Sequence, residues 1–292
     1  MRPNVPSRLR RLVVTAVAAC SLAAGLAAPA GAAARPNAST ARLDPQGVQL
    51  VATYLRRSRH ATTRAELVGA NVTGKRIFTH VRGASAAYDK RSIETIATYV
   101  VRAGLPELKA TLGASLVVYN DSLGYVTKAN LFELMKLSPD VLHRIRDAGT
   151  TIHVGDRPIT TMAGFGTLDA TPVRGHDPSE RWSDLGGAYS PSADIVAAGR
   201  GNASYGRYTG TILHELGHAY DAKTNASADP AFREILLRIG RHTDPYYAQP
   251  GDAGAQEYFA DLCRSYWTGG TAKVADDFGP EAAAWMTRTV PR

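Results

Sequence analysis

The chain has 292 residues, with 34 lysines and arginines against 26 aspartates and glutamates. Four of the arginines lie in residues 1–34, so the remaining 258 residues carry 30 basic and 26 acidic side chains, a net charge of +4. This mild charge, without a basic stripe, gives no indication of nucleic-acid binding. No segment after residue 34 is long and apolar enough to span a membrane.

Residues 1–34 are predicted to be a secretory signal peptide. Four arginines precede an apolar, alanine-rich run at 12–28, and residues 30–32 supply a small-x-small cleavage site. A twin-arginine signal at residues 10–11, a lipoprotein-type site ending at Cys20 and a membrane anchor are the alternatives. The richness in Ala, Arg and Gly is typical of a high-GC bacterium. We therefore expect a secreted, extracellular bacterial protein that leaves the membrane after signal cleavage.

Cysteine usage argues against an internal disulfide in the mature chain. Only Cys20 and Cys263 are present, and Cys20 leaves with the signal. The expected role of Cys263 is that of a small buried apolar residue. The alternative, a thiolate that binds a metal in a latent form, has no ligand spacing to support it.

Apolar periodicity and β-branched runs predict the elements in chain order. After a disordered leader at 35–42, the pattern predicts helices at 45–57 and 93–103, a strand at 114–119, a helix at 131–148 interrupted at Ser138-Pro139, and a strand at 150–154. Then follow a loop at 155–185, a hairpin arm at 186–198 with Pro191 at a turn or edge position, and helices near 208–221, 229–240, 254–267 and 279–288.

This order of helices, a few short strands and more helices predicts an α+β fold that is mainly helical, with a small mixed sheet. We place a weak domain boundary near 105–113. It separates a helical N-terminal region, 35–111, from a metal-binding domain, 112–292. A pro-segment, a substrate-recognition subdomain and a part of the core are the alternatives for the N-terminal region.

The strongest functional signal is His214-Glu215-Leu216-Gly217-His218, a His-Glu-x-x-His motif on a predicted helix. Residues i and i+4 share one helical face, so both histidines can direct an imidazole at a single ion. Glu215 lies next to the first ligand, where it can take a proton from a water that the metal activates. An amphipathic helix with two hydrogen-bonded histidines is the alternative.

Gly217 lies inside this predicted helix, where glycine costs about 1 kcal/mol relative to alanine. A position without a side chain indicates that another element or a substrate passes close to the helix.

The motif needs a third ligand. The residues after His218 lack the glycine and histidine of the metzincin extension, so that class is excluded. A carboxylate from a later helix is the alternative, and the aromatic segment 256–267 carries Glu257 and Asp261 at i and i+4. Unpaired buried carboxylates are costly, so both acids need partners: Glu257 can bind zinc, and Asp261, one turn on, can accept the outward N–H of a ligand histidine. A solvated pair is the alternative.

The combination of His-Glu-Leu-Gly-His-Ala-Tyr-Asp with Glu-Tyr-Phe-Ala-Asp some forty residues later resembles gluzincin-type zinc metallopeptidases. It is similar to the anthrax lethal factor catalytic domain and to secreted Pro-Pro endopeptidases, over roughly residues 112–290. The resemblance implies a zincin-like domain, Glu257 as third zinc ligand, and a tyrosine that assists at the substrate carbonyl. Tyr246 and Tyr247 fall in the matching region, with a slightly longer gap to Glu257, and we narrowly favour Tyr247. Exposed loop tyrosines are the alternative.

These patterns predict a secreted zinc metalloendopeptidase that acts on a peptide or protein as a monomer, with Zn²⁺ as cofactor. Glu215 would activate the attacking water. One alternative is a secreted protein that retains the metal and binds a partner without cleaving it. Another is a toxin-like effector protease, against which the small size and the lack of an evident translocation domain argue.

Overall fold

The computed structural model describes residues 43–60, 63–89, 92–119, 123–168, 173, 179–201, 211–239 and 246–292. The predicted signal peptide and leader lie outside these residues. The chain from residue 36 onward forms one compact unit. Within its described part, no helix has the length and apolarity needed to cross a membrane.

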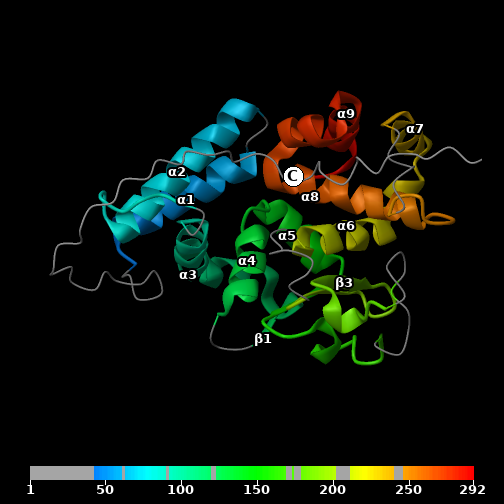
Figure 1. The fold of residues 1–292 in the computed structure, drawn as a ribbon, viewed down its shortest axis with the longest axis horizontal. Helices are drawn as coiled ribbons and strands as arrows, with labels where there is room; N and C mark the ends of the chain where they lie inside the picture. Colours follow the sequence, from blue (N-terminus) through cyan, green and yellow to red (C-terminus); the bar gives the residue numbers. More distant parts are fainter. Residues whose placement is uncertain are drawn as a thin grey trace, which may run out of the picture. The chain divides into compact units, whose positions relative to one another are not determined.

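The described residues are mostly helical and include a small mixed sheet, as the α+β prediction expected (Figure 1). The helices are α1 (Pro45–His60), α2 (Arg64–Arg82), α3 (Ser92–Leu112), α4 (Tyr125–Leu134), α5 (Pro139–Asp147), α6 (Thr211–Thr224), α7 (Pro230–Ile239), α8 (Ala253–Phe278) and α9 (Pro280–Thr289). The strands are β1 (Leu116–Tyr119), β2 (Thr151–Gly155), β3 (Gly187–Ser190) and β4 (Ile195–Ala198).

The four strands lie in the order β1-β2-β4-β3. β1, β2 and β4 are parallel, whereas β3 pairs with β4 in the antiparallel sense and forms one edge. Alternate residues of each strand enter different cores, as the period of two requires. Val196 of β4 joins the large helical core, whereas its neighbour Ala197 packs on the other face of the sheet. The helix α6 contacts both β3 and β4.

Several predicted boundaries are confirmed. The predicted break at Ser138-Pro139 lies between α4 and α5. The helix α5 begins there because the Ser138 hydroxyl caps it, accepting a hydrogen bond from the Val141 N–H at 3.3 Å. The hairpin arm at 186–198 is the β3–β4 pair, with Pro191 in its turn. Cys263 is fully buried and free.

The helix α2 was not predicted. Its apolar residues are not confined to one face of the helix, since Val68 and Val72 are exposed, and this weakens the periodic pattern. A local signal was nevertheless present: Thr63 and Glu66 form a capping box, in which the Glu66 N–H donates to Thr63 Oγ1 and the Thr63 N–H donates to Glu66 Oε2.

Other helices are longer than predicted. The helix α3 continues through Pro106 to Leu112, and α8 continues to Phe278 across a kink at Gly270, which has a positive φ of 67°. The domain boundary near 111 stays a prediction. Helix α3, which ends there, packs on α4 and α5, and α1 packs on α8.

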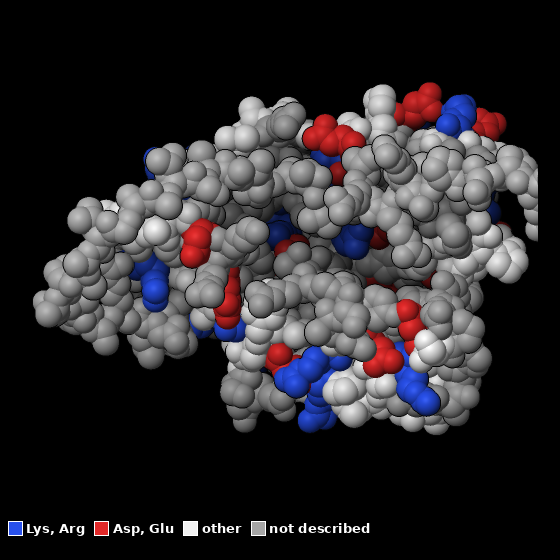
Figure 2. All heavy atoms as spheres, viewed as in Figure 1, with Lys and Arg blue, Asp and Glu red and all other residues white. Residues whose placement is uncertain are grey.

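The residue distribution over the face drawn in Figure 2 matches the mild net charge. Described lysines and arginines lie among aspartates and glutamates on this face.

The packing of α6 on α8 explains Gly217. A Cβ at this position would lie 2.7 Å from the Ala260 Cα and 3.1 Å from the Cys263 Cβ, closer than such atoms approach. Another element therefore passes close to the motif helix, as the sequence indicated, and that element is α8. Backbone cannot move aside as a side-chain end can, so glycine is required here.

We predict that Gly217→Ala lowers the free energy of unfolding by about 1–3 kcal/mol, because the added methyl group overpacks the α6–α8 contact. Gly69→Ala is the matched control on α2, where the nearest atom, the Arg57 Nη1, is 4.0 Å from the added Cβ. That variant should gain roughly 0.5–1 kcal/mol from helix propensity. Urea unfolding of both variants measures the difference, and equal effects would contradict the packing account.

Candidate metal centre

Three side chains from two helices converge on one point. His214 and His218 extend from α6, and Glu257 extends from the first turns of α8. The two Nε2 atoms are 3.1 Å apart, and each lies 3.2 Å from Glu257 Oε2. Among the described residues, these three are the group whose ligand atoms lie close enough to hold one metal ion.

The donor set fits a zinc ion. Two imidazoles with one carboxylate make up a catalytic zinc site that keeps a position open. With Zn–ligand bonds of about 2.0–2.1 Å, the corners of a tetrahedron are separated by roughly 3.3 Å. The separations of 3.1–3.2 Å between the three donor atoms match this value.

Asp261 supports the cluster from one helical turn beyond Glu257. Its Oδ1 lies 2.9 Å from His214 Nδ1, so the other ring nitrogen, Nε2, faces the cluster. The same carboxylate forms an ion pair with Arg264 at 2.9 Å and accepts a hydrogen bond from the Tyr247 hydroxyl at 2.5 Å. These contacts fix the orientation of the His214 ring.

Burial and charge set the protonation of this group. Burial lowers the pKa of His214, but the neighbouring carboxylates, Asp261 foremost, together outweigh burial and raise the pKa to about 10. Burial raises the pKa of Glu257, but hydrogen bonds with the two histidines hold it far below its usual range. In the same way, burial raises the pKa of Asp261, but His214, Arg264 and the Tyr247 hydroxyl together outweigh burial and lower the pKa to about 2.

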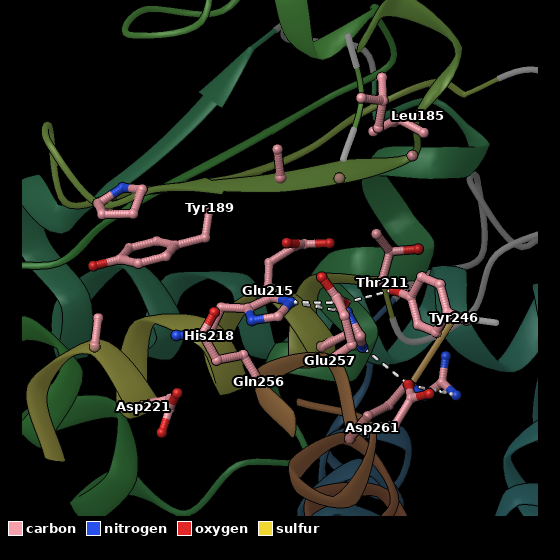
Figure 3. Close-up of a pocket in the computed structure, with 18 of the residues that line it drawn as sticks. Leu185, Tyr189, Thr211, Glu215, His218, Asp221, Tyr246, Gln256, Glu257 and Asp261 are labelled. Carbon is pink, nitrogen blue, oxygen red and sulfur yellow. Dashed lines mark hydrogen bonds and ion pairs between the residues drawn. The ribbon is translucent and has the colours of Figure 1, made fainter. Parts of the chain in front are cut away.

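Glu215 lies between the cluster and the sheet. Its side chain is only 8% exposed. Figure 3 shows it extending from α6 toward β3, away from Asp261. Burial raises the pKa of Glu215, and the neighbouring charges of His214 and His218 lower it in part.

The two candidate tyrosines have different partners. The Tyr246 hydroxyl donates to Glu257 Oε2 at 2.6 Å, and Tyr246 lines the cavity in front of the cluster. The Tyr247 hydroxyl donates to Asp261, and its ring packs edge-on against the buried Tyr258. Gly254, in the first turn of α8, leaves room for the Tyr247 carbonyl oxygen. Tyr246 therefore lies at the open side of the site, and Tyr247 on its inner side.

The cavity over the site has a volume of about 760 Å³ and extends on both sides of Glu215. Leu185 and Tyr246 lie toward one end and Tyr189 toward the other (Figure 3). Its upper wall is β3, and the site helix α6 is its floor.

The edge strand β3 has backbone groups directed away from the sheet. The Gly199 N–H donates to the Gly186 carbonyl at 2.9 Å, so residues 186 and 199 form a hydrogen-bonded pair. Antiparallel ladders alternate such pairs with pairs that exchange no hydrogen bonds. Gly187 and Tyr189, opposite Ala198 and Val196, thus direct their N–H and carbonyl groups away from β4. In the described part of the chain, no strand pairs with this edge.

Comparison with known proteins gives similarities to solved structures, with 19 matching chains. No protein-family model matches the chain, and no curated protein matches it either. Among solved structures, the Pro-Pro endopeptidase from Paenibacillus alvei is similar at 21% identity with a TM-score of 0.48. The match covers 61% of this chain and 98% of that one.

The structure adds residues that the sequence patterns did not single out. Arg264 pairs with Asp261 three positions earlier on α8, a helical spacing that was available as a signal. Tyr189 lines the cavity, and its hydroxyl donates to Asp194 Oδ1 at 3.2 Å. Lys223 at the end of α6 pairs with the same aspartate. The partners of Asp194 lie in other elements of the structure, so no pattern within its own segment indicates these contacts.

We predict that Asp261→Asn weakens zinc binding by about 10–100-fold, because the amide no longer stabilises and orients the His214 ring as the carboxylate does. Competition against a chromophoric chelator gives the Kd. Asp276→Asn is the matched control, since this exposed aspartate lies on the same helix away from the cluster. Equal zinc affinity in all three proteins would show that Asp261 does not support the site.

Proposed function

We propose that the chain is a secreted, zinc-dependent endopeptidase. The observation that carries this proposal is the arrangement of Glu215. Its buried carboxylate lies beside a cluster of two histidines and a glutamate, and it faces a cavity bordered by the outer edge of β3, with which no described strand pairs. Secretion rests on the predicted signal peptide at 1–34.

His214, His218 and Glu257 would hold Zn²⁺. When bound there, the ion polarises the scissile carbonyl and acidifies a water molecule. Asp261 keeps the His214 ring in the orientation that presents Nε2. Glu215 takes the proton of the attacking water and later donates it to the leaving amine. A base that is buried but flanked by two histidines suits both steps, because its pKa is raised toward the working pH.

We assign the role of oxyanion donor to Tyr246 and not to the narrowly favoured Tyr247. Tyr246 lines the cavity, and its hydroxyl is one hydrogen bond from the Glu257 carboxylate. Burial and the Glu257 charge raise its pKa, so it stays a proton donor at neutral pH. Tyr247 is engaged with Asp261 and acts through the position of that residue.

The substrate would bind as an added strand along β3. The backbone groups of Gly187 and Tyr189 that point away from β4 can pair with an extended peptide. Since the cavity continues on both sides of Glu215, the peptide extends past the cleaved bond in both directions. This geometry favours cleavage within a chain over removal of a terminal residue.

We predict that Glu215→Ala lowers kcat/KM by about 10²–10⁴, because it removes the general base, while zinc content stays at one per chain. Mass-spectrometric cleavage profiling on a peptide library, with metal analysis of the same samples, tests this. A Glu215→Ala protein that retains zinc and cleaves the library as well as the wild type would refute the mechanism. A wild type that retains zinc but cleaves no peptide would favour a binding protein.

Tyr246→Phe and Tyr247→Phe form a matched pair, because the same hydroxyl is removed from adjacent residues. We predict that Tyr246→Phe lowers kcat by about 10²–10³ through loss of the oxyanion donor, with unchanged zinc affinity. Tyr247→Phe should mainly weaken zinc binding through Asp261. Steady-state kinetics and chelator competition separate the two, and the reverse pattern would transfer the catalytic role to Tyr247.

A further inference from the structure

We propose that Gly187 is a positioning residue for Glu215. The missing side chain at this position of β3 leaves the space in which the Glu215 side chain is held. The proposal rests on the proposed function, in which Glu215 exchanges the proton. It adds that β3, in the sheet, limits the position of this side chain, which extends from helix α6.

The contact is direct. A Cβ at Gly187 would meet Thr211 Cγ2 well inside van der Waals contact, and it would lie 2.9 Å from Glu215 Cγ and 3.0 Å from Glu215 Oε1. Thr211 and Glu215 are at positions i and i+4, so they present one face of α6 to the strand. Figure 3 shows both side chains beneath β3.

Backbone conformation does not explain this glycine. Gly187 is not one of the glycines with a positive φ, so an alanine could adopt its extended conformation. Its neighbour Ala188 carries a side chain on the other face of the strand, in the second core. The requirement at Gly187 is therefore space on the α6 side.

Neither wall can easily move away. The strand is fixed by its ladder to β4 and by the Gly199–Gly186 hydrogen bond. The helix α6 is fixed on its other side by α8, whose backbone lies against Gly217. Because Glu215 is buried and its Cγ lies near the fixed end of the side chain, an added methyl group displaces the carboxylate from its place beside the cluster.

The substituted strand would keep its peptide-binding edge. The N–H and carbonyl of Gly187 point away from β4, at right angles to the position of the added Cβ. Gly187→Ala therefore changes the position of the Glu215 side chain and leaves unchanged the backbone groups that would pair with the substrate. The expected change lies in kcat and not in KM.

The test is a kinetic comparison of Gly187→Ala with the wild type on one cleaved peptide. We expect kcat to fall roughly a hundredfold, as for a misplacement of about 1 Å, with KM changed by less than about twofold. Zinc content should remain at one per chain. A crystal structure of the variant should show the Glu215 carboxylate displaced.

Two further variants serve as controls. Ser190→Ala changes the same strand on the face away from α6, and it should leave kcat and zinc content unchanged. In Gly187→Ala/Thr211→Ser, the contact with the threonine methyl group is removed while the contact with Glu215 persists. We expect this double variant to recover thermal stability relative to Gly187→Ala but not kcat.

Unchanged kcat in Gly187→Ala, with Glu215 in its original place, would overturn the proposal while the peptidase assignment stood. Recovery of kcat by Thr211→Ser, or loss of kcat in step with loss of zinc, would also overturn it. A wild type without peptidase activity would instead refute the proposed function. In that case the crystal structure of Gly187→Ala still tests the steric contact by the position of the Glu215 side chain.

Discussion

The close contact between α6 and α8 is the constraint on which the site depends. His214 and His218 come from one helix and Glu257 from the other, so their donor atoms meet only at this helix separation. Gly217, on the motif helix, permits the separation because its missing side chain admits the backbone at Ala260. A larger residue would move the two halves of the cluster apart, since interiors are packed too densely to absorb it.

Burying so many polar groups requires that they satisfy one another. Asp261 pairs with the His214 ring, Arg264 adds a positive partner, and the Tyr247 hydroxyl donates a further hydrogen bond to the carboxylate. Glu257 Oε2 likewise lies 3.2 Å from the Nε2 atoms of both histidines. Removing one member leaves the others uncompensated in a low-dielectric setting, which makes the network rigid and its members interdependent. The two helices thus present a preorganised set of ligands.

The sheet completes the site from the other side. β3 is an edge strand, and its register with β4 directs the backbone of Gly187 outward while its α-carbon faces Glu215. The same short strand therefore borders the cavity, directs backbone groups away from β4 and limits the space of Glu215, the proposed base. A small sheet is sufficient for this site, because only the outer edge of β3 and the face toward α6 contribute to it.

Local patterns predicted the parts of this architecture that local chemistry determines. The His-x-x-x-His spacing, the Glu257–Asp261 spacing and the Ser138 cap each lie within a few residues, so they are visible in the chain. The helix α2 was missed because its exposed Val68 and Val72 weaken the apolar stripe, although Thr63 and Glu66 cap it.

Contacts between distant elements could not be read in this way. The different partners of Tyr246 and Tyr247 depend on how their loop folds onto α8, and Gly187 meets Glu215 only after the hairpin docks on α6. Neither contact has a signature within its own segment, since each depends on where a second element lies.

The central claim is that His214, His218 and Glu257 together hold one zinc ion. Anomalous diffraction from crystals of the protein, measured on both sides of the zinc absorption edge, tests it most directly. The account predicts a single strong peak at about 2.0–2.2 Å from the Nε2 atoms of both histidines and from a Glu257 oxygen. A zinc-replete protein without a peak there, or with its peak on other residues, would contradict the account.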